Sequence, residues 1–214
     1  MKDLNAALRA LATAKHKAFS EKLIPTVAPE TILGVPMPAL RKLAKGIDRS
    51  FLADLPHATY EENILHSLLI NDLPAEEALR AMDAFLPYLD NWAVVDAIDP
   101  RAFHKGDYIE DYIRLMKSPA PYGRRLGIVL ALRHVKEDPE RLMNAVEAAE
   151  SGHYYVDMAM AWFFVEAALY EAEAVLRRLE EGALPASVHK KTIRKIKESR
   201  RVPPAVKDRA SALQ

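Results

Sequence analysis

The feature that most constrains this chain is a regular recurrence of paired helical segments. Apolar residues recur at three- and four-residue spacing over most of the sequence, and this spacing predicts amphipathic helices. The short connections between them contain Pro, Gly, Asp or Asn, which favour turns. The pairs are predicted to start near residues 59, 91, 121, 153 and 187, at intervals of 30 to 34 residues. Two helices in each unit of this length predict an α-solenoid.

The period also predicts how the chain is organised. The units share little sequence identity, which is typical of HEAT-like repeats, and we expect an all-α fold. We predict one HEAT-like repeat domain over residues 1–214, with residues 1–50 as an atypical N-terminal cap because they do not follow the period. Stacked pairs predict a curved slab in which one layer of helices lines a concave, basic groove. Only residues 31–35, with the sequence TILGV, hint at a strand.

Composition excludes several classes of site. The 214 residues include no cysteine, so disulfides and thiolate metal sites are excluded, and the histidines lack metal-ligand spacing. The sequence contains no nucleophile elbow, phosphate-binding loop or dinucleotide fingerprint. We therefore expect no metal and no cofactor, and no obligatory protein partner is evident. The N-terminus lacks the apolar core of a signal peptide and the longest apolar run is too short to cross a bilayer, so we expect a cytoplasmic protein that does not bind membranes.

The charge is unevenly distributed along the chain. The formal net charge is zero, which by itself argues weakly against nucleic-acid binding. Residues 187–209, however, hold nine Lys or Arg against Glu198 and Asp208. Because local fields rather than the total charge attract a polyanion, this segment predicts contact with one, although a merely solvated helix face is the alternative.

Chemically distinctive side chains recur at similar places in the repeats. Asp96 follows Trp92 by four residues, so a helix presents the carboxylate and the indole on one face. If first helices line one surface, the next three units add a guanidinium, a second indole and two ammonium groups to it. These residues are Arg125, Trp162, Lys191 and Lys195. Such a surface suits nucleic acid, because cations bind phosphates and indoles attract cationic groups.

Each of these residues also has a purely structural interpretation. A tryptophan in an α-solenoid is more often core than ligand contact, which applies to Trp92 and Trp162. Asp96 could cap the next helix, although Asp99, directly before a proline, is the better candidate for a cap. Arg124 and Arg125 open a helix, where positive charge is slightly unfavourable, and this placement suggests another use.

Five segments together resemble a known family. In chain order they read ILGVPMPALRKLAKGI, LDNWAVVDAI, YGRRLGIVLAL, YYVDMAMAWFFVEAAL and VHKKTIRKIKES. They are similar in order and spacing to the motifs of the AlkD-like DNA alkylation repair proteins, which are HEAT-like repeat DNA glycosylases. The resemblance covers residues 30–200.

The resemblance implies a glycosylase that removes positively charged N3- or N7-alkylated purines from double-stranded DNA. The family's Trp-x-x-x-Asp motif falls on Trp92 and Asp96, its arginine on Arg125 with Arg124 beside it, and its later tryptophan on Trp162. By this resemblance, the aspartate stabilises the sugar cation, the tryptophans hold the lesion, and the arginine binds phosphates. We expect further backbone contacts from Lys190, Lys191, Arg194 and Lys195.

The N-terminus departs from the family pattern. The glycosylases have an N-terminal helical extension with an aromatic residue, and the corresponding stretch here is residues 15–30. Pro25 and Pro29 are predicted to cut any helix in it short, and Phe19 is its only aromatic residue. This departure favours one alternative, a DNA-binding member without glycosylase activity that prefers bent or branched DNA. The neutral net charge favours another, a protein-interaction scaffold.

Overall fold

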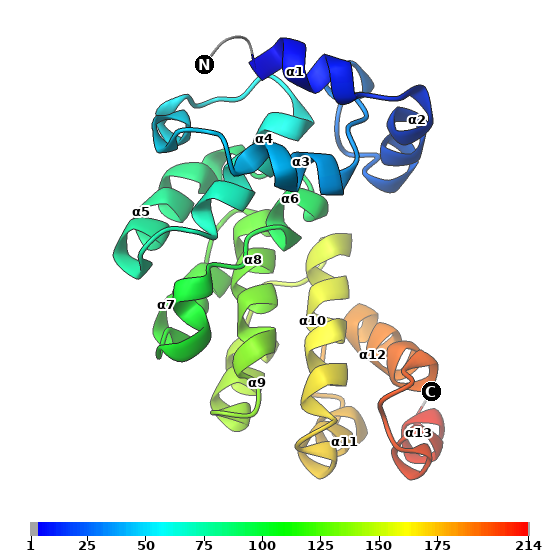
Figure 1. Cartoon of the computed structure of the whole chain (residues 1–214). Coiled ribbons are helices and arrows are strands. Elements are labelled where there is room, and N and C mark those ends of the chain that lie inside the picture. Colours follow the sequence, from blue (N-terminus) through cyan, green and yellow to red (C-terminus); the bar gives the residue numbers. More distant parts are fainter. Residues whose placement is uncertain (1–3, 214) are drawn as a thin grey trace. The chain divides into compact units, whose positions relative to one another are not determined.

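The computed structural model describes residues 4–213, and these residues form helices and no strand (Figure 1). The fold class is therefore all-α, as predicted. Across residues 4–213 no helix has both the length and the apolar character needed to span a lipid bilayer.

The chain divides into two compact units, the first ending at Gly106 and the second beginning at Asp107. The division falls inside the predicted pair that starts near residue 91, between its two helices. The first unit contains α1 (Leu4–Leu11), α2 (Ala14–Leu23), α3 (Met37–Ala44), α4 (Tyr60–Ile70), α5 (Ala75–Phe85) and α6 (Trp92–Asp96). The second contains α7 (Ile109–Met116), α8 (Pro121–Ala131), α9 (Pro139–Glu147), α10 (Tyr154–Ala167), α11 (Ala172–Glu180), α12 (Ala186–Glu198) and α13 (Pro204–Ser211).

Helices α4, α6, α8, α10 and α12 begin within one residue of the predicted starts of the helix pairs. Local signals explain this agreement. The Thr59 hydroxyl accepts a hydrogen bond from the amide of Glu62, whose carboxylate binds the Thr59 amide in return, and this capping box starts α4. The side chain of Asn91 accepts from the amide of Val94 and starts α6. Pro121 occupies the first position of α8, where a missing N–H is harmless.

The hint of a strand at residues 31–35 was wrong. The segment is extended after the short 3-10 turn Pro29–Thr31, but its amides do not pair with another strand. They donate to the carboxylate of Glu61 on α4 instead. A side chain thus satisfies the backbone groups that a neighbouring strand would otherwise satisfy.

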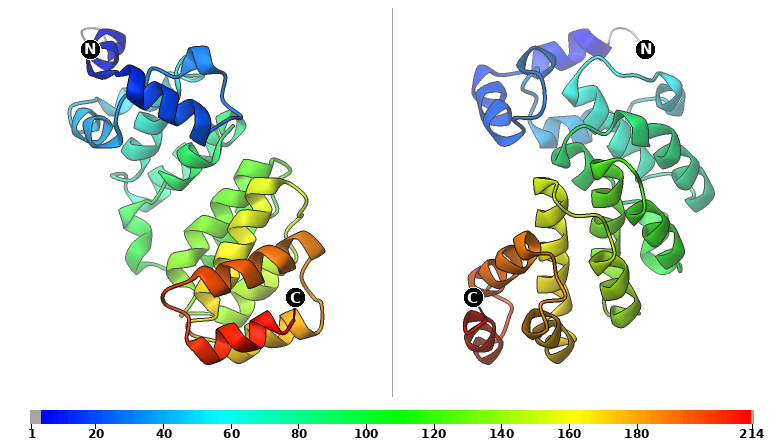
Figure 2. Two further views of the ribbon diagram at one scale, coloured as in Figure 1. Left: turned by 90° about the vertical axis from the view of Figure 1, so that its right-hand side faces the viewer. Right: turned by 180° about the vertical axis from the view of Figure 1, so that it is seen from behind.

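Within the second unit, the first helices of successive pairs pack side by side. Helix α10 lies between α8 and α12, while α7 packs on α9 and α11 packs on α13 (Figures 1 and 2). The middle position of α10 explains why it is apolar on most of its circumference. Phe163 and Phe164 are fully buried in this unit. Trp162 on the same helix is 42% exposed.

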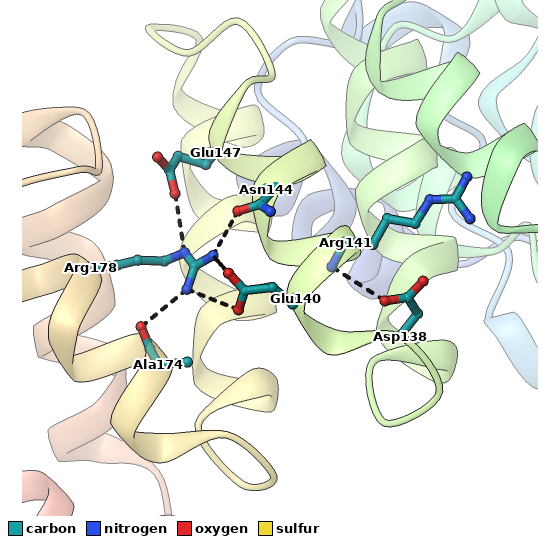
Figure 3. A network of polar contacts seen from close by, with 7 residues as sticks. All are labelled: Asp138, Glu140, Arg141, Asn144, Glu147, Ala174 and Arg178. Carbon is teal, nitrogen blue, oxygen red and sulfur yellow. Dashed lines mark hydrogen bonds and ion pairs between the residues drawn. The ribbon is translucent and has the colours of Figure 1, made fainter.

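A buried guanidinium joins α9 to α11 (Figure 3). Arg178 on α11 donates to Glu140 at 2.7 Å, to Asn144 at 2.7 Å and to Glu147 at 3.2 Å, all three on α9. It also donates to the carbonyl oxygen of Ala174, one turn earlier on its own helix. Since the Arg178 side chain is almost fully buried, these acceptors compensate for the water that it loses.

Candidate active site in the first unit

The first unit contains a cavity of about 740 Å³. Side chains from α2, α3, α4 and α6, and from the segment that follows α6, line it. Its aromatic lining residues are Phe19, Tyr60 and Trp92, and its carboxylates are Asp72, Asp96 and Asp99. The lining also includes His16, Leu23, Val35, Arg41, Lys45, Asn71, Arg101 and His104.

Trp92 and Asp96, which are one helical turn apart, both line this cavity. They occupy the first and last positions of α6. Trp92 packs against the buried cluster of Ile24, Val27 and Ile32, and its indole N–H donates to the carbonyl oxygen of Leu23 at 3.1 Å. The indole is thereby fixed in orientation. The 3-10 turn that follows has Pro100 at its N-cap position, which makes no side-chain cap hydrogen bond.

Phe19 lines the same cavity, and the sequence did not place it there. It lies on α2, where it is 60% exposed. Helix α2 forms because the Thr13 hydroxyl accepts from the amide of His16, and it ends at Leu23, two residues before Pro25. The proline does stop the helix, as predicted, but the ten residues before it are enough to carry an aromatic side chain to the cavity.

Tyr60, the third aromatic residue of the lining, remains protonated at physiological pH. Burial of its hydroxyl, with a smaller contribution from the Glu61 carboxylate, raises the pKa of Tyr60 to about 12. It therefore offers a neutral phenol to the cavity.

A fully buried carboxylate shapes two walls of the cavity. Glu61 accepts hydrogen bonds from the amides of Leu33 at 3.0 Å, Gly34 at 2.7 Å and Val35 at 3.2 Å. The Gly34 carbonyl oxygen in turn accepts from the amide of Thr13, the N-cap of α2. Glu61 thus holds both the segment that leads into α3 and the start of the helix that carries Phe19.

Gly34 is required in this arrangement. Its φ of +94° is rarely adopted by residues with a side chain, and a Cβ there would lie 2.5 Å from the Lys17 amide nitrogen. The signal for Glu61 was present in the sequence. It precedes the buried residues Ile64 and Leu65 by three and four positions, so it lies on the buried face of α4.

Two cavity aspartates, Asp72 and Asp99, each lie beside a basic side chain. Asp72 forms an ion pair with Arg101, and Asp99 lies 2.9 Å from Nε2 of His104. Asn71 organises this wall. Its side chain accepts from the amide of Asp99 at 2.6 Å and donates to the carbonyl oxygen of Ala97 at 2.8 Å. Residues 4–213 contain no group of three or more His, Asp or Glu side chains that could hold a metal ion.

Arg124 and Arg125, in the second unit, are both only 6% exposed. Arg124 donates to the carbonyl oxygens of Ser118 and Pro119 at 2.8 and 2.9 Å, and Glu150 lies 2.8 Å away. These acceptors explain why a guanidinium is tolerated at the start of α8. Arg125 donates to the carbonyl oxygen of Tyr155 at 2.6 Å, a contact between α8 and α10.

The basic residues of α12 differ in how far they are already paired. Lys190 is exposed and Lys195 is half-buried. Arg194 is also exposed and donates to Glu198 at 2.9 Å. Lys191 lies 3.5 Å from the buried Asp157 and over the ring of Tyr154. On α12, Arg194 and Lys191 are therefore already paired with carboxylates of the protein, whereas Lys190 is exposed to solvent.

The structure thus brings together Trp92, Asp96 and, in addition, Phe19. Arg125, Trp162 and the basic residues of α12 belong to the second unit. The convergence of both sets on one concave groove stays a prediction.

Comparison with known proteins adds one finding. A family model described as DNA alkylation repair enzyme matches residues 4–200. This match confirms the resemblance seen in the sequence motifs, and it extends to α1 and α2. A separate comparison with curated proteins finds no match.

Proposed function

Since the chain belongs to the DNA alkylation repair enzyme family, we propose that it is a DNA glycosylase that removes positively charged N3- or N7-alkylated purines from double-stranded DNA. The observation that carries the proposal is that Phe19, Trp92 and Asp96 line one cavity. A carboxylate beside aromatic faces is complementary to a substrate that is cationic before and during the reaction.

The chemistry fits this lining. The bond between C1′ and the purine nitrogen breaks, its electron pair stays on the base, and the base leaves neutral, so no strong general acid is needed. Positive charge moves to the sugar, which resembles an oxocarbenium ion. In the proposal the Asp96 carboxylate stabilises that charge. A water molecule then adds to C1′ and loses a proton, and the same carboxylate is suited to orient it.

The aromatic residues act on the substrate before the bond breaks. An indole face attracts a cation by roughly 0.5–2 kcal/mol, depending on how far the pair is desolvated. Trp92 is suited to this role because the hydrogen bond from its indole N–H to the Leu23 carbonyl oxygen fixes the orientation of the ring. Phe19, on the helix that ends at Leu23, supplies a second face. We propose that Trp162 adds a third when DNA is bound.

The phosphate contacts in the second unit are part of the same proposal. We assign them to Arg125 and to Lys190, Lys191, Arg194 and Lys195 on α12, since cations that neutralise phosphates release counterions. Arg124 already binds two carbonyl oxygens and Glu150. We therefore assign it the support of the segment before α8 rather than a phosphate contact.

A base-release assay tests the proposal. Methylated duplex DNA is incubated with the protein, and free N7-methylguanine is measured against the spontaneous rate. Asp96→Asn is expected to lower release about 100-fold or more while duplex binding is retained, because electrostatic stabilisation of the transition state is lost. Asp208→Asn, at an exposed position of α13, is the matched control and should release base like the wild type.

The alternatives give other results in the same assay. Equal release by Asp96→Asn and the wild type removes the assigned role of the carboxylate. Salt-sensitive duplex binding without release above the spontaneous rate indicates a DNA-binding member that is not a glycosylase. Absence of duplex binding at moderate salt favours a protein-interaction scaffold.

A further inference from the structure

Helix α3 presents two basic side chains to the cavity. Arg41 and Lys45 are four residues apart, so they lie on one face of the helix, one turn from each other. Both line the cavity and both are exposed. Lys42, which is also exposed, lies on a different face of α3 and does not line the cavity.

The other basic side chains of the lining are already engaged. Arg101 is paired with Asp72, and His104 with Asp99. His16 is hydrogen-bonded to the hydroxyl of Thr13 at 3.1 Å. Within residues 4–213, by contrast, neither Arg41 nor Lys45 forms an ion pair with a carboxylate.

A nucleotide in this cavity would create a charge problem that these two residues solve. A sugar that approaches Asp96 brings its own phosphodiesters, because they are covalently attached to it. The phosphates would therefore meet the Asp96 carboxylate, while Asp72 and Asp99 on the same wall already have Arg101 and His104 beside them. Two like charges about 4 Å apart repel by about 1 kcal/mol in water and by more where water is excluded. Cations that are not already neutralised are needed beside the sugar.

A purely structural role for Arg41 and Lys45 has to be weighed against this one. Cations in the last turn of a helix stabilise it by about 0.3–1 kcal/mol through the helix dipole. That effect depends on position along the helix and not on the face, so Lys42 benefits from it equally. It therefore does not distinguish Arg41 and Lys45, which line the cavity, from Lys42, which does not.

We propose that Arg41 and Lys45 form a phosphate-binding subsite that holds the DNA backbone beside the nucleotide whose sugar faces Asp96. This subsite rests on the proposed function for its ligand, DNA. It places a phosphate contact in the first unit, on the same cavity as the reacting carboxylate.

The test measures the salt dependence of duplex binding. The affinity for a short fluorescent duplex that contains a non-cleavable abasic-site analogue is measured between about 50 and 200 mM salt. The slope of log K against log salt changes by about 0.9 for each phosphate that the protein neutralises. The double variant Arg41→Gln/Lys45→Gln should lower the magnitude of this slope by about 0.9 if the two share one phosphate, and by about 1.8 if they bind two.

The matched control removes the same charge elsewhere in the first unit. Lys22→Gln/Lys42→Gln changes two exposed lysines that do not line the cavity, and its slope should stay within about 0.3 of the wild type. Because all four positions are exposed, thermal unfolding should be nearly unchanged in both double variants. Equal slopes for the two double variants overturn the subsite.

Failure of the subsite and failure of the proposed function are distinguishable. The binding assay requires no base release, so the slope has the same meaning if the protein proves not to be a glycosylase. A wild type that releases base, together with unchanged slopes in Arg41→Gln/Lys45→Gln, overturns the subsite alone. A wild type that shows no salt-sensitive duplex binding overturns both.

Discussion

The indole N–H of Trp92 donates a hydrogen bond to the carbonyl oxygen of Leu23, 3.1 Å away, and so ties α6 to the end of α2. This contact matters because α2 contributes no buried residue of its own. At its other end the helix is held by the bond from the Thr13 amide to the Gly34 carbonyl oxygen. The helix that carries Phe19 is therefore positioned mainly through its two ends.

Trp92→Phe should loosen α2 while it keeps an aromatic ring in the cavity. Loss of one hydrogen bond is expected to lower the free energy of unfolding by about 1 kcal/mol. Amide exchange in α2 should become faster, because its C-terminal attachment is weakened. Hydrogen exchange followed by mass spectrometry measures this. Trp162→Phe is the control, and equal protection of α2 in both variants would contradict the attachment.

Phe19→Ala tests the aromatic residue that the sequence left unplaced. Since its side chain is 60% exposed, stability should change by less than about 0.5 kcal/mol. Release of alkylated base should fall by roughly 2- to 30-fold, which corresponds to one lost cation–π contact. Tyr88→Ala, an exposed aromatic residue outside the cavity, should leave release unchanged. Equal rates for both variants would exclude Phe19 from the site.

Glu61→Gln should destabilise the first unit although it barely changes the size of the side chain. Three backbone amides lose a charged acceptor, and one of them faces an amide group that cannot accept from it. We expect a loss of about 1.5–3 kcal/mol in the free energy of unfolding, measured in urea. Glu76→Gln, whose side chain is exposed on α5, is the control. A loss no larger than in the control would show that the three hydrogen bonds to Glu61 are not needed for stability.

A hydrogen-bonded histidine pair, with each ring stacked on a phenylalanine, should make the first unit sensitive to acid. His57 Nε2 lies 2.8 Å from His66 Nδ1, and the rings stack on Phe51 and Phe85. Burial, followed by the charge of His57, lowers the pKa of His66 from 6.5 to about 3. Burial also lowers the pKa of His57, against the opposing carboxylates of Glu62 and Asp54.

The pH dependence follows from these directions. Between pH 6.5 and about 3 the unfolded chain binds more protons at His66 than the folded chain, so stability is full above pH 6.5 and is lost as the pH falls. The slope approaches about 1.4 kcal/mol per pH unit for each such proton. Urea unfolding at pH 7, 6 and 5 checks this. His57→Gln should flatten the profile, whereas His16→Gln on the exposed α2 should not.

Arg178→Ala should weaken the contact of α9 with α11. Removal of the guanidinium leaves Glu140 and Glu147 without their partner. Since both carboxylates retain access to water, we expect a loss of about 1–3 kcal/mol, less than for a fully buried pair. Arg177→Ala, the exposed neighbour on α11, should change stability by no more than about 0.5 kcal/mol. Similar melting temperatures for the two variants would contradict the assigned role of Arg178.

The sequence by itself determined the helices and their period. The signals that start them act within three or four residues, as in the capping box of Thr59 and Glu62 or the cap at Asn91. Helical geometry alone also put Trp92 and Asp96 on one face. Five motifs in order were enough to identify the family, because their order and spacing carry more information than any one of them.

Only the tertiary structure decided what surrounds Trp92 and Asp96. Phe19 reaches the cavity because the carbonyl oxygen of Leu23 accepts a hydrogen bond from Trp92, 69 positions later in the chain. Glu61 holds the segment before α3 because it accepts hydrogen bonds from amides that lie 26 to 28 positions before it. Arg124, for which the sequence predicted a contact with DNA phosphate, is buried and forms an ion pair with Glu150. A local pattern reports the face on which a side chain lies, but partners distant in sequence decide whether it is buried, paired or open to a ligand.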